Sequence, residues 1–211
     1  MTQYLDIAQW SRRATYEFYR NFEQPFFNIC AMVDVTCLRN YCKAHGYSFA
    51  IAALYCGARV GNELEAFRYR LRDEGVLVHP QQDIGSTVLL ENESMVFAYF
   101  KYHPDFHTFY EGAAEEMARA KSGQAFDPAD ERDDLIHHST FPWVHFTSFM
   151  HARRHRSSDS IPKMVYGKFQ EQQGRVMLPV SVEVHHALMD GLHVGRYFQH
   201  FEDLCRSEQW S

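Results

Sequence analysis

The chain has 211 residues, of which 45% are apolar and 23% are charged. This length and composition suit one globular domain, or two small ones, and exclude a long disordered chain, a collagen-like fibre and a low-complexity array. The formal net charge of -6 argues against nucleic-acid binding. The densest basic stretch, residues 153–156, has no interleaved aromatic residues and is typical of an exposed loop.

Two residue classes are over-represented. Aromatic residues make up 15% of the chain, and there are 13 histidines. The composition therefore leaves two hypotheses: a histidine-rich metal protein, or an aromatic-walled pocket in which one histidine carries the chemistry.

The cysteines and the N-terminus indicate the compartment. The chain has five cysteines, an odd number, and no pair has C-x-x-C spacing, so we expect no disulfide framework and a reducing cytoplasm. The first residues lack the charged and apolar regions of a signal peptide. The longest apolar run, near residues 49–56, is far too short to span a bilayer. We therefore expect a soluble, cytoplasmic protein that does not enter a membrane.

Helices and a strand are predicted in the first part of the chain. An aromatic-rich helix is expected over residues 10–22, and an apolar strand over 26–35. Asp34 or Thr36 can cap a helix that ends near Gly46, and Ser48 can cap another that runs to Ala58.

The middle and the end of the chain alternate between strands and helices. Patterning predicts strands at residues 67–71, 76–78, 86–90 and 95–102, a helix over 106–121, a loop over 127–134, and strands at 143–149, 163–171 and 175–186. Gln172-Gln173-Gly174 is typical of a hairpin turn. The last helix is expected to begin near His193, with apolar residues at i, i+3, i+4 and i+7. Without repeats or linkers, this mixture predicts a single α/β domain over residues 1–211.

The sequence from Val184 to His193, VHHALMDGLH, is the sharpest chemical feature. It lies where a strong strand ends and a helix is about to begin, and such junctions carry side chains to the rim of a sheet. A histidine there is largely neutral at pH 7 and can act as a general base on a hydroxyl or thiol.

Three structural alternatives apply to the same residues. His185 and His186 can both be strand-end residues with no chemical role, and Asp190-Gly191 can be only a turn. The histidines, with His193, can also ligate a metal, but adjacent residues of a strand point to opposite faces. Spacing alone therefore leaves catalysis and structure about equally favoured.

Several segments resemble the trimeric, CoA-dependent chloramphenicol acetyltransferase family, in the same order along the chain. Trp10-Ser11-Arg12-Arg13 and Tyr16-Glu17-Phe18-Tyr19-Arg20 resemble its opening helix. Residues 139–144, STFPWV, resemble its serine-containing S-x-x-P-W-V element, and residues 178–182, LPVSV, lead into the histidine pair as the family's strand does. The resemblance implies a two-layer sandwich of a mixed β-sheet with helices (α/β, or α+β), and transfer of the acetyl group of acetyl-CoA to chloramphenicol, which inactivates the antibiotic.

The resemblance also implies the catalytic residues. His186 would be the general base that takes a proton from the acceptor hydroxyl. Ser139 would donate a hydrogen bond to the oxyanion of the tetrahedral intermediate. Asp190 would pair with Arg12 and hold the loop, while His193 would be structural.

The family's active sites lie between the subunits of a homotrimer, with acetyl-CoA as co-substrate and no metal. Residues that would line the acceptor pocket, largely on the neighbouring chain, are Phe18, Tyr19, Met95, Phe97, Phe126, Phe149 and Val165. Residues that would lie near acetyl-CoA are Lys168, Phe169 and Trp143. The alternative for the aromatic members of these sets is core packing.

The chain departs from the family in a segment that faces the antibiotic. His151, Arg153 and Lys163 replace mostly apolar residues, and Val165 replaces a threonine that helps to hydrate the intermediate. Glu183 stands where the family usually has Gln. Since a buried cation without a partner is costly, these side chains either point to solvent or meet a different acceptor. Acetyl transfer is therefore a firmer expectation than chloramphenicol as the acceptor.

Two other functions stay open. The first is an acyltransferase core of the 2-oxo-acid dehydrogenase type, which shares the fold and an H-x-x-x-D-G motif. It is disfavoured because those proteins carry a lipoyl domain and an Ala/Pro linker ahead of the core. The second is a metal- or ligand-binding protein, for which His151 and His155 have helical ligand spacing, although the intervening Arg153-Arg154 and the strand-like context weaken it.

Overall fold

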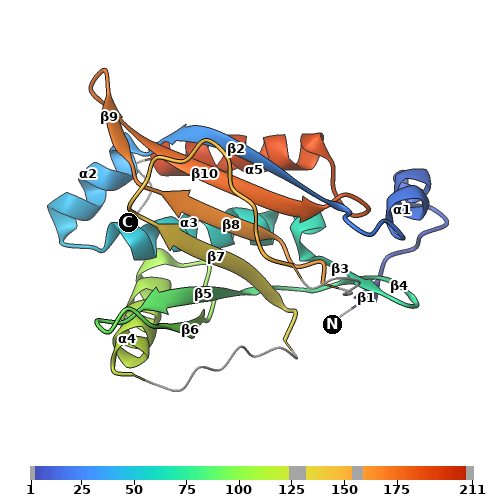
Figure 1. Ribbon diagram of the computed structural model, residues 1–211, viewed down its shortest axis with the longest axis horizontal. Coiled ribbons are helices and arrows are strands. Elements are labelled where there is room, and N and C mark those ends of the chain that lie inside the picture. Colours follow the sequence, from blue (N-terminus) through green and yellow to red (C-terminus); the bar gives the residue numbers. More distant parts are fainter. Residues whose placement is uncertain (1–2, 124–131, 154–158, 208–211) are drawn as a thin grey trace.

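The computed structural model describes residues 3–123, 132–153 and 159–207. Its centre is a seven-stranded sheet of order β2-β10-β8-β7-β5-β6, in which β9 also pairs with β10 (Figure 1). The strands are β2 (Phe26–Asp34), β5 (Asp83–Leu89), β6 (Met95–Phe100), β7 (Leu135–Phe141), β8 (Lys163–Gly167), β9 (Gln170–Gln172) and β10 (Arg175–His185). Strand β7 is parallel to β5 and β8, and the other pairs are antiparallel. The predicted mixed sheet is confirmed.

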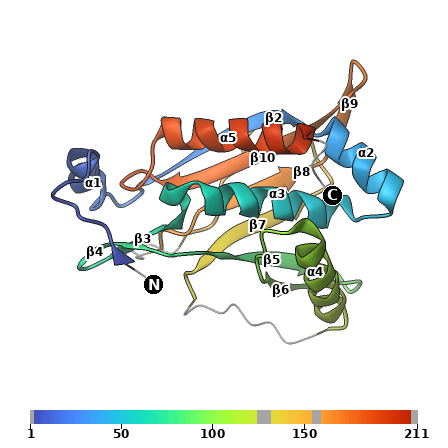
Figure 2. The same cartoon turned by 180° about the vertical axis from the view of Figure 1, so that it is seen from behind.

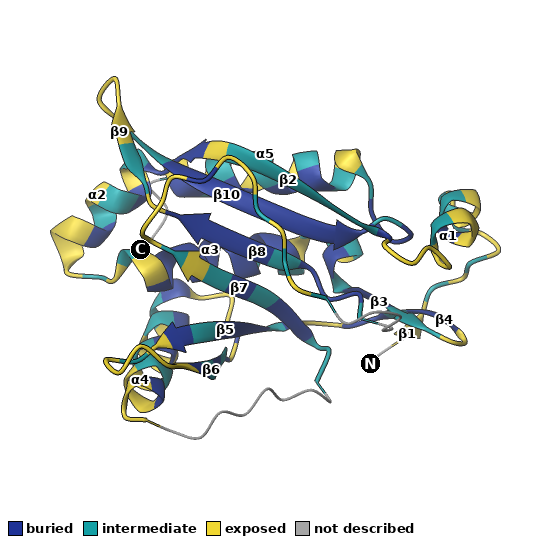
Figure 3. Ribbon diagram, in the orientation of Figure 1, coloured by how far each residue is buried: buried dark blue, intermediate teal, exposed yellow. Residues whose placement is uncertain are grey.

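Helices cover one face of this sheet. Helices α3 (Phe49–Glu63) and α5 (Gly191–Arg206) lie side by side on it, with α2 (Thr36–His45) at one end and α4 (Phe106–Lys121) against β5 and β6 (Figure 2). Residues 142–153, which follow β7, cross the opposite face (Figure 1). Strands β8 and β10 lie between these layers and are largely buried (Figure 3). No helix in the described ranges is long and apolar enough to cross a membrane.

Local sequence explains how these elements begin and end. The buried stripe of α5 consists of Val194, Tyr197, Phe201 and Cys205, at the spacing of an amphipathic helix. Helix α2 ends at Gly46, whose φ of 72° suits glycine. The predicted hairpin turn lies between β9 and β10, but Gln172 belongs to β9 and the turn consists of Gln173 and Gly174, whose φ values are 51° and 77°.

Four predicted elements differ from the structure. The strand predicted at 163–171 is interrupted at residues 168–169 and forms two strands, β8 and β9, which pair with different stretches of β10. The prediction of a strand at 143–149 is wrong. The strand in this part of the chain is β7, which ends just before Pro142, and proline has no N–H to donate to a neighbouring strand. Phe146 and Phe149 instead pack against each other in an irregular loop. Helix α3 runs past Ala58 to Glu63, and at Gly57 it passes so close to β8 that a Cβ there would lie 2.0 Å from the Tyr166 hydroxyl. Helix α1 (Arg13–Tyr19) is shorter than the predicted 10–22.

A small second sheet holds the N-terminal segment. Its order is β1 (Gln3–Tyr4), β4 (Gly75–Val78) and β3 (Tyr69–Arg72), and the short 3-10 helix η1 (Glu65–Arg68) precedes β3. Leu5 N–H donates to Val76 O (2.8 Å), and the Trp10 ring meets the Tyr69 ring edge-on at 5.8 Å. These contacts fix the chain just before Arg12.

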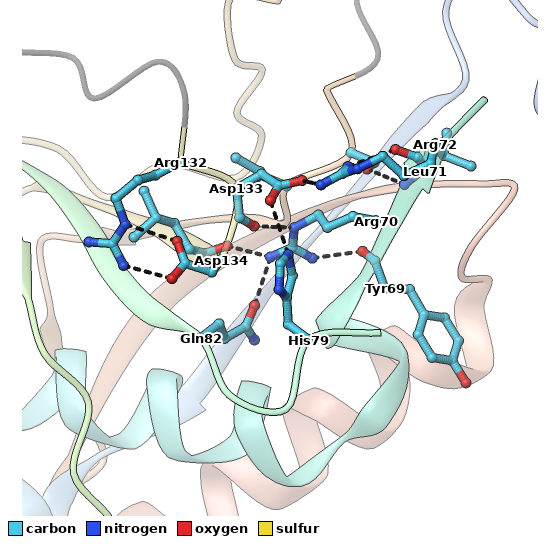
Figure 4. A network of polar contacts seen from close by, with 12 residues as sticks. Tyr69, Arg70, Leu71, Arg72, His79, Gln82, Arg132, Asp133 and Asp134 are labelled. Atoms are coloured by element: carbon cyan, nitrogen blue, oxygen red, sulfur yellow. Dashed lines mark hydrogen bonds and ion pairs between the residues drawn. The ribbon is translucent and has the colours of Figure 1, made fainter. Parts of the chain in front are cut away.

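Arg70 joins the small sheet to the large one (Figure 4). Its fully buried guanidinium donates to the carbonyls of Phe67, Tyr69, Asp133 and Leu135 and to Gln82 Oε1. Burial lowers its pKa to about 10, so it stays charged at neutral pH. Asp133 also pairs with Arg72 and accepts from His79 Nε2 (3.0 Å).

Candidate active site

The junction between β10 and α5 holds the histidine pair. Leu188 N–H and Met189 N–H both donate to His185 O, which closes a turn directly after the strand. Asp190 caps α5, and its Oδ1 accepts from Leu192 N–H (3.0 Å) and lies 2.8 Å from His193 Nδ1. The capping arrangement gives His193 the structural role expected of it.

The His186 ring is held between two aromatic rings. The Tyr19 ring stacks on it with centroids 4.0 Å apart and planes 5° from parallel, and the Phe27 ring lies 4.7 Å away. The backbone is fixed as well, because His186 N–H donates to Pro25 O (2.7 Å). Nδ1 is buried and meets no hydrogen-bond partner among the described residues.

Arg12 binds the loop that joins β10 to α5. Nη2 donates to His186 O and Nη1 to Leu188 O, both at 3.3 Å, and Nε lies 3.5 Å from Asp190 Oδ2. Burial alone raises the pKa of Asp190, but the hydrogen bond with His193 and the charge of Arg12 outweigh burial and lower it. Asp190 is therefore an anion at neutral pH, as a salt-bridge partner of Arg12 must be.

His185 lies on the other face of the strand end. It is buried, meets the Phe26 ring edge-on at 5.0 Å, and accepts at Nδ1 from Ala187 N–H (3.2 Å). Burial, with a smaller effect of Arg153, lowers its pKa to about 4. The two histidines thus have separate surroundings, as strand alternation predicts.

Ser139 lies far from His186 within one chain. It pairs in register with Val165, which pairs with Ser181 on β10. His186 lies five residues beyond Ser181, which at 3.3 Å a residue is roughly 16 Å along the strand. A single chain therefore does not bring its own Ser139 and His186 to one reacting carbonyl.

The residues predicted to line the acceptor pocket are also spread out. Tyr19 contacts His186, while Phe18 is 62% exposed and meets the Tyr19 ring edge-on and the Phe22 ring at a tilt. Met95 and Phe97 lie on β6, at the sheet edge farthest from β2. Val165 is fully buried beside Ser139, and Phe126 lies outside the described residues.

Two of the three residues predicted near acetyl-CoA lie together. Lys168 N–H donates to Val144 O (3.1 Å), next to Trp143, which is 57% exposed. Phe169 instead packs against Phe49, with the Arg39 guanidinium 4.9 Å over its ring.

A cavity of about 880 Å³ opens beside the His185 side of the sheet. Phe149, predicted for the acceptor pocket, is one of its walls, and so are His151, Arg153, Glu183 and His185. Sequence reasoning flagged His151, Arg153 and Lys163 but missed the partners of the two cations, Asp159 and Glu183. Two features of the sequence could have indicated these partners: the i, i+4 spacing of Asp159 and Lys163, and an acidic residue at position 183. Among the described residues no three His, Cys, Asp or Glu side chains group as metal ligands would.

A family model described as chloramphenicol acetyltransferase matches residues 2–202. The chain belongs to the chloramphenicol acetyltransferase family. It is 28% identical over 202 residues to the chloramphenicol acetyltransferase of Proteus mirabilis, covering 95% of this chain and 93% of that one. It is 29% identical over 205 residues to chloramphenicol acetyltransferase 3 of Escherichia coli, covering 96% of each. The prediction of an acyltransferase is confirmed.

Solved structures agree with this assignment. One chloramphenicol acetyltransferase superposes with a TM-score of 0.91 at 30% identity, covering 98% of this chain and 100% of that one. A dihydrolipoamide acetyltransferase of Azotobacter vinelandii has a TM-score of 0.70 at 16% identity, over 91% of this chain and 85% of that one. The second likeness shows that the fold is shared with the alternative acyltransferase cores, and nothing more.

Proposed function

We propose that this protein is an acetyl-CoA-dependent O-acetyltransferase that acetylates a hydroxyl of chloramphenicol or of a similar hydroxylated small molecule. The observation that carries the proposal is the His186 ring, clamped by Tyr19 and Phe27 on a loop that Arg12 fastens. Membership of the chloramphenicol acetyltransferase family supports the choice of both substrates. Since acetyl-CoA is an intracellular metabolite, we propose a cytoplasmic location.

His186 is proposed as the general base. Its neutral imidazole takes the proton of the acceptor hydroxyl as the hydroxyl oxygen attacks the acetyl carbonyl carbon of the thioester. Ser139 donates a hydrogen bond to the carbonyl oxygen as it becomes an oxyanion. When the intermediate collapses, the C–S bond breaks, and the departing thiolate takes the proton from the imidazolium. The products are the acetyl ester and free CoA thiol, and His186 is neutral again.

The active site is proposed to form between two copies of the chain. Ser139 and His186 lie roughly 16 Å apart along the strand direction in one copy, too far to act on one carbonyl. A cyclic trimer repeats one interface three times, so His186 of each copy can meet Ser139 of the next. Exposed apolar side chains support such an interface: Phe18, Phe22, Trp143 and Met150 are each between 45% and 86% exposed. Acetyl-CoA would approach from the side of Lys168, Phe169 and Trp143.

Thiol release tests this function. Purified protein with acetyl-CoA should release CoA thiol faster when chloramphenicol is present, and His186→Ala should lower this rate by about 10²- to 10⁴-fold. The exposed His103→Ala variant is the matched control and should keep the rate. A fully active His186→Ala variant would overturn the general-base role. No acceptor-dependent release with chloramphenicol would overturn chloramphenicol as the acceptor.

A further inference from the structure

Arg12, which binds the loop between β10 and α5, has aromatic neighbours of its own. Its guanidinium carbon lies 5.8 Å over the centroid of the Trp10 ring, within the range of a cation–π contact. The Trp10 ring lies 5.8 Å from the Tyr16 ring, tilted by 55°, and 5.8 Å from the Tyr69 ring, which it meets edge-on. Because Tyr16 and Tyr69 are both buried, Trp10 rests on two rings that belong to the core.

The hydrogen bonds of Arg12 do not by themselves fix its position. Its two terminal nitrogens reach the carbonyls of His186 and Leu188 at 3.3 Å, and Nε lies 3.5 Å from Asp190 Oδ2. All three contacts are longer than the roughly 2.7–3.2 Å of a typical N–H···O bond, so a shift of less than about 1 Å would break them. The guanidinium therefore needs packing that holds it in place.

The helix that follows Arg12 is too short to supply this packing alone. Helix α1 has seven residues, all of them described, and Tyr16 is its one buried side chain. Arg12 occupies the N-cap position without a side-chain cap. Since helices shorter than about 12 residues are marginal by themselves, the direction of Arg12 depends on tertiary contacts.

Tyr69 connects Trp10 to the large sheet. Its carbonyl accepts from Arg70 Nη1 (2.7 Å), and its ring points away from that guanidinium (Figure 4). Arg70 also donates to Leu135 O at the start of β7. A continuous set of contacts thus leads from β7 through Arg70, Tyr69 and Trp10 to Arg12.

We infer that Trp10 is a positioning residue: held by Tyr69, it orients Arg12, and Arg12 orients His186 through the carbonyls of the loop. The inference rests on the proposed function, because it concerns the base of that reaction. It adds to the pairing of Arg12 with Asp190, since it gives the small sheet, which the proposed chemistry does not otherwise use, a part in aiming the base.

A double-mutant cycle with Arg12 tests the inference by kinetics. Trp10→Ala should lower kcat by about 2- to 10-fold, the worth of one aromatic contact, and leave KM for acetyl-CoA unchanged. Trp10→Phe keeps a ring and should recover most of kcat. When Trp10→Ala is added to Arg12→Met, kcat should fall by less than about twofold, because the residue through which Trp10 acts is gone.

Tyr41→Ala is the matched control. Tyr41 is a half-buried aromatic residue of α2 that packs against His45 and Tyr47, and α2 lies at the opposite end of the molecule from α1 (Figure 1). This variant should lose stability to urea as Trp10→Ala does, and it should keep kcat. An equal fall in kcat would show that activity simply follows stability, and would overturn the inference.

Amide hydrogen exchange tests the same coupling without any reaction. The N–H groups of Leu188 and Met189 donate to His185 O, so their exchange reports how well the loop is held. In peptides that span residues 184–192, Trp10→Ala and Arg12→Met should each exchange about 2- to 10-fold faster than the unaltered protein. The double variant should exchange no faster than Arg12→Met.

Three further results would overturn the inference: unchanged kcat and exchange in Trp10→Ala, the full fall in kcat when Trp10→Ala is added to Arg12→Met, or a change in KM for acetyl-CoA in place of kcat. If Trp10→Ala does not fold, Tyr69→Leu, which removes the ring that Trp10 meets edge-on, should give the same pattern. An unaltered protein that transfers no acetyl group would count against the proposed function, while the exchange measurement would still decide the inference.

Discussion

The Tyr19 ring stacks on the His186 ring with centroids 4.0 Å apart and planes only 5° from parallel. The two residues come from opposite ends of the chain, α1 and the end of β10. Such stacking fixes the plane of the imidazole without using either of its nitrogens. A general base needs a fixed ring and an unused nitrogen, because that nitrogen must stay free and aimed at the acceptor hydroxyl.

Tyr19→Ala should therefore lower kcat while Tyr19→Phe keeps it. The stacking of two rings is worth about 0.5–1.5 kcal/mol, which corresponds to about a 2- to 10-fold fall in kcat. Steady-state kinetics at saturating acetyl-CoA measure the change, and Phe tests the ring separately from the hydroxyl. An unchanged kcat in Tyr19→Ala would show that the stack does not position His186.

Arg12→Met should lower both stability and kcat. The substitution leaves the carbonyls of His186 and Leu188 without their donor, and a lost hydrogen bond of this kind costs about 1–3 kcal/mol. Asp190→Asn should cost less, about 1 kcal/mol, because that carboxylate is 39% exposed and water screens the ion pair. Urea unfolding measures both. Equal losses in the two variants would contradict the view that the carbonyl contacts of Arg12 matter most.

Arg70→Met should be among the most destabilising substitutions of a charged residue. Four backbone carbonyls lose their buried donor, so we expect a fall of at least about 3 kcal/mol in the free energy of unfolding. The control is Arg72→Met, which removes a partly exposed ion pair with Asp133 and should cost about 1 kcal/mol. Similar urea midpoints for the two variants would show that Arg70 does not join the sheets energetically.

Strong local patterns predicted much of this fold. Helix α4 begins and ends where predicted, since Asp105 caps it and apolar residues repeat along it. The turn at Gln173-Gly174 has the positive φ values that this pair of residues favours. The mistaken strand at 143–149 has another cause. An aromatic run looks like a strand, but only a partner strand decides whether it forms one, and that partner is distant in sequence.

The candidate site was predictable only in part. The histidine pair was visible from its place between a strand and a helix. The partners of Arg153 were not, because Asp159 lies in an irregular segment and Glu183 in a distant strand. Nor could spacing show that Ser139 and His186 lie far apart within one folded chain, because that distance depends on the order of the strands.

Buried histidines should make the protein acid-sensitive. Burial lowers the pKa of His138 to about 3, well below the 6.5 of an exposed histidine. Below pH 6.5 the unfolded chain therefore binds a proton that the folded chain does not bind until about pH 3. Stability is complete above pH 6.5 and falls as the pH drops, by about 1.4 kcal/mol per pH unit for each such group.

His138→Leu should flatten this dependence. Its unfolding free energy, measured by urea between pH 7 and pH 4, should change less steeply with pH than that of the unaltered protein. The exposed His200→Gln is the control and should keep the original slope. An unchanged slope in His138→Leu would show that His138 is not held neutral in the core.

The central claim is that His186 of one copy works with Ser139 of another, and mixing two inactive variants tests it directly. His186→Ala and Ser139→Ala should each be nearly inactive alone. Ser139→Ala should lower the rate of thiol release by about 10²- to 10³-fold. When the two are unfolded together and refolded in equal amounts, about a quarter of the sites in random trimers should combine an intact His186 with an intact Ser139. The account predicts that thiol release returns to about a quarter of the unaltered rate. Activity that stays at the level of the separate variants would contradict it.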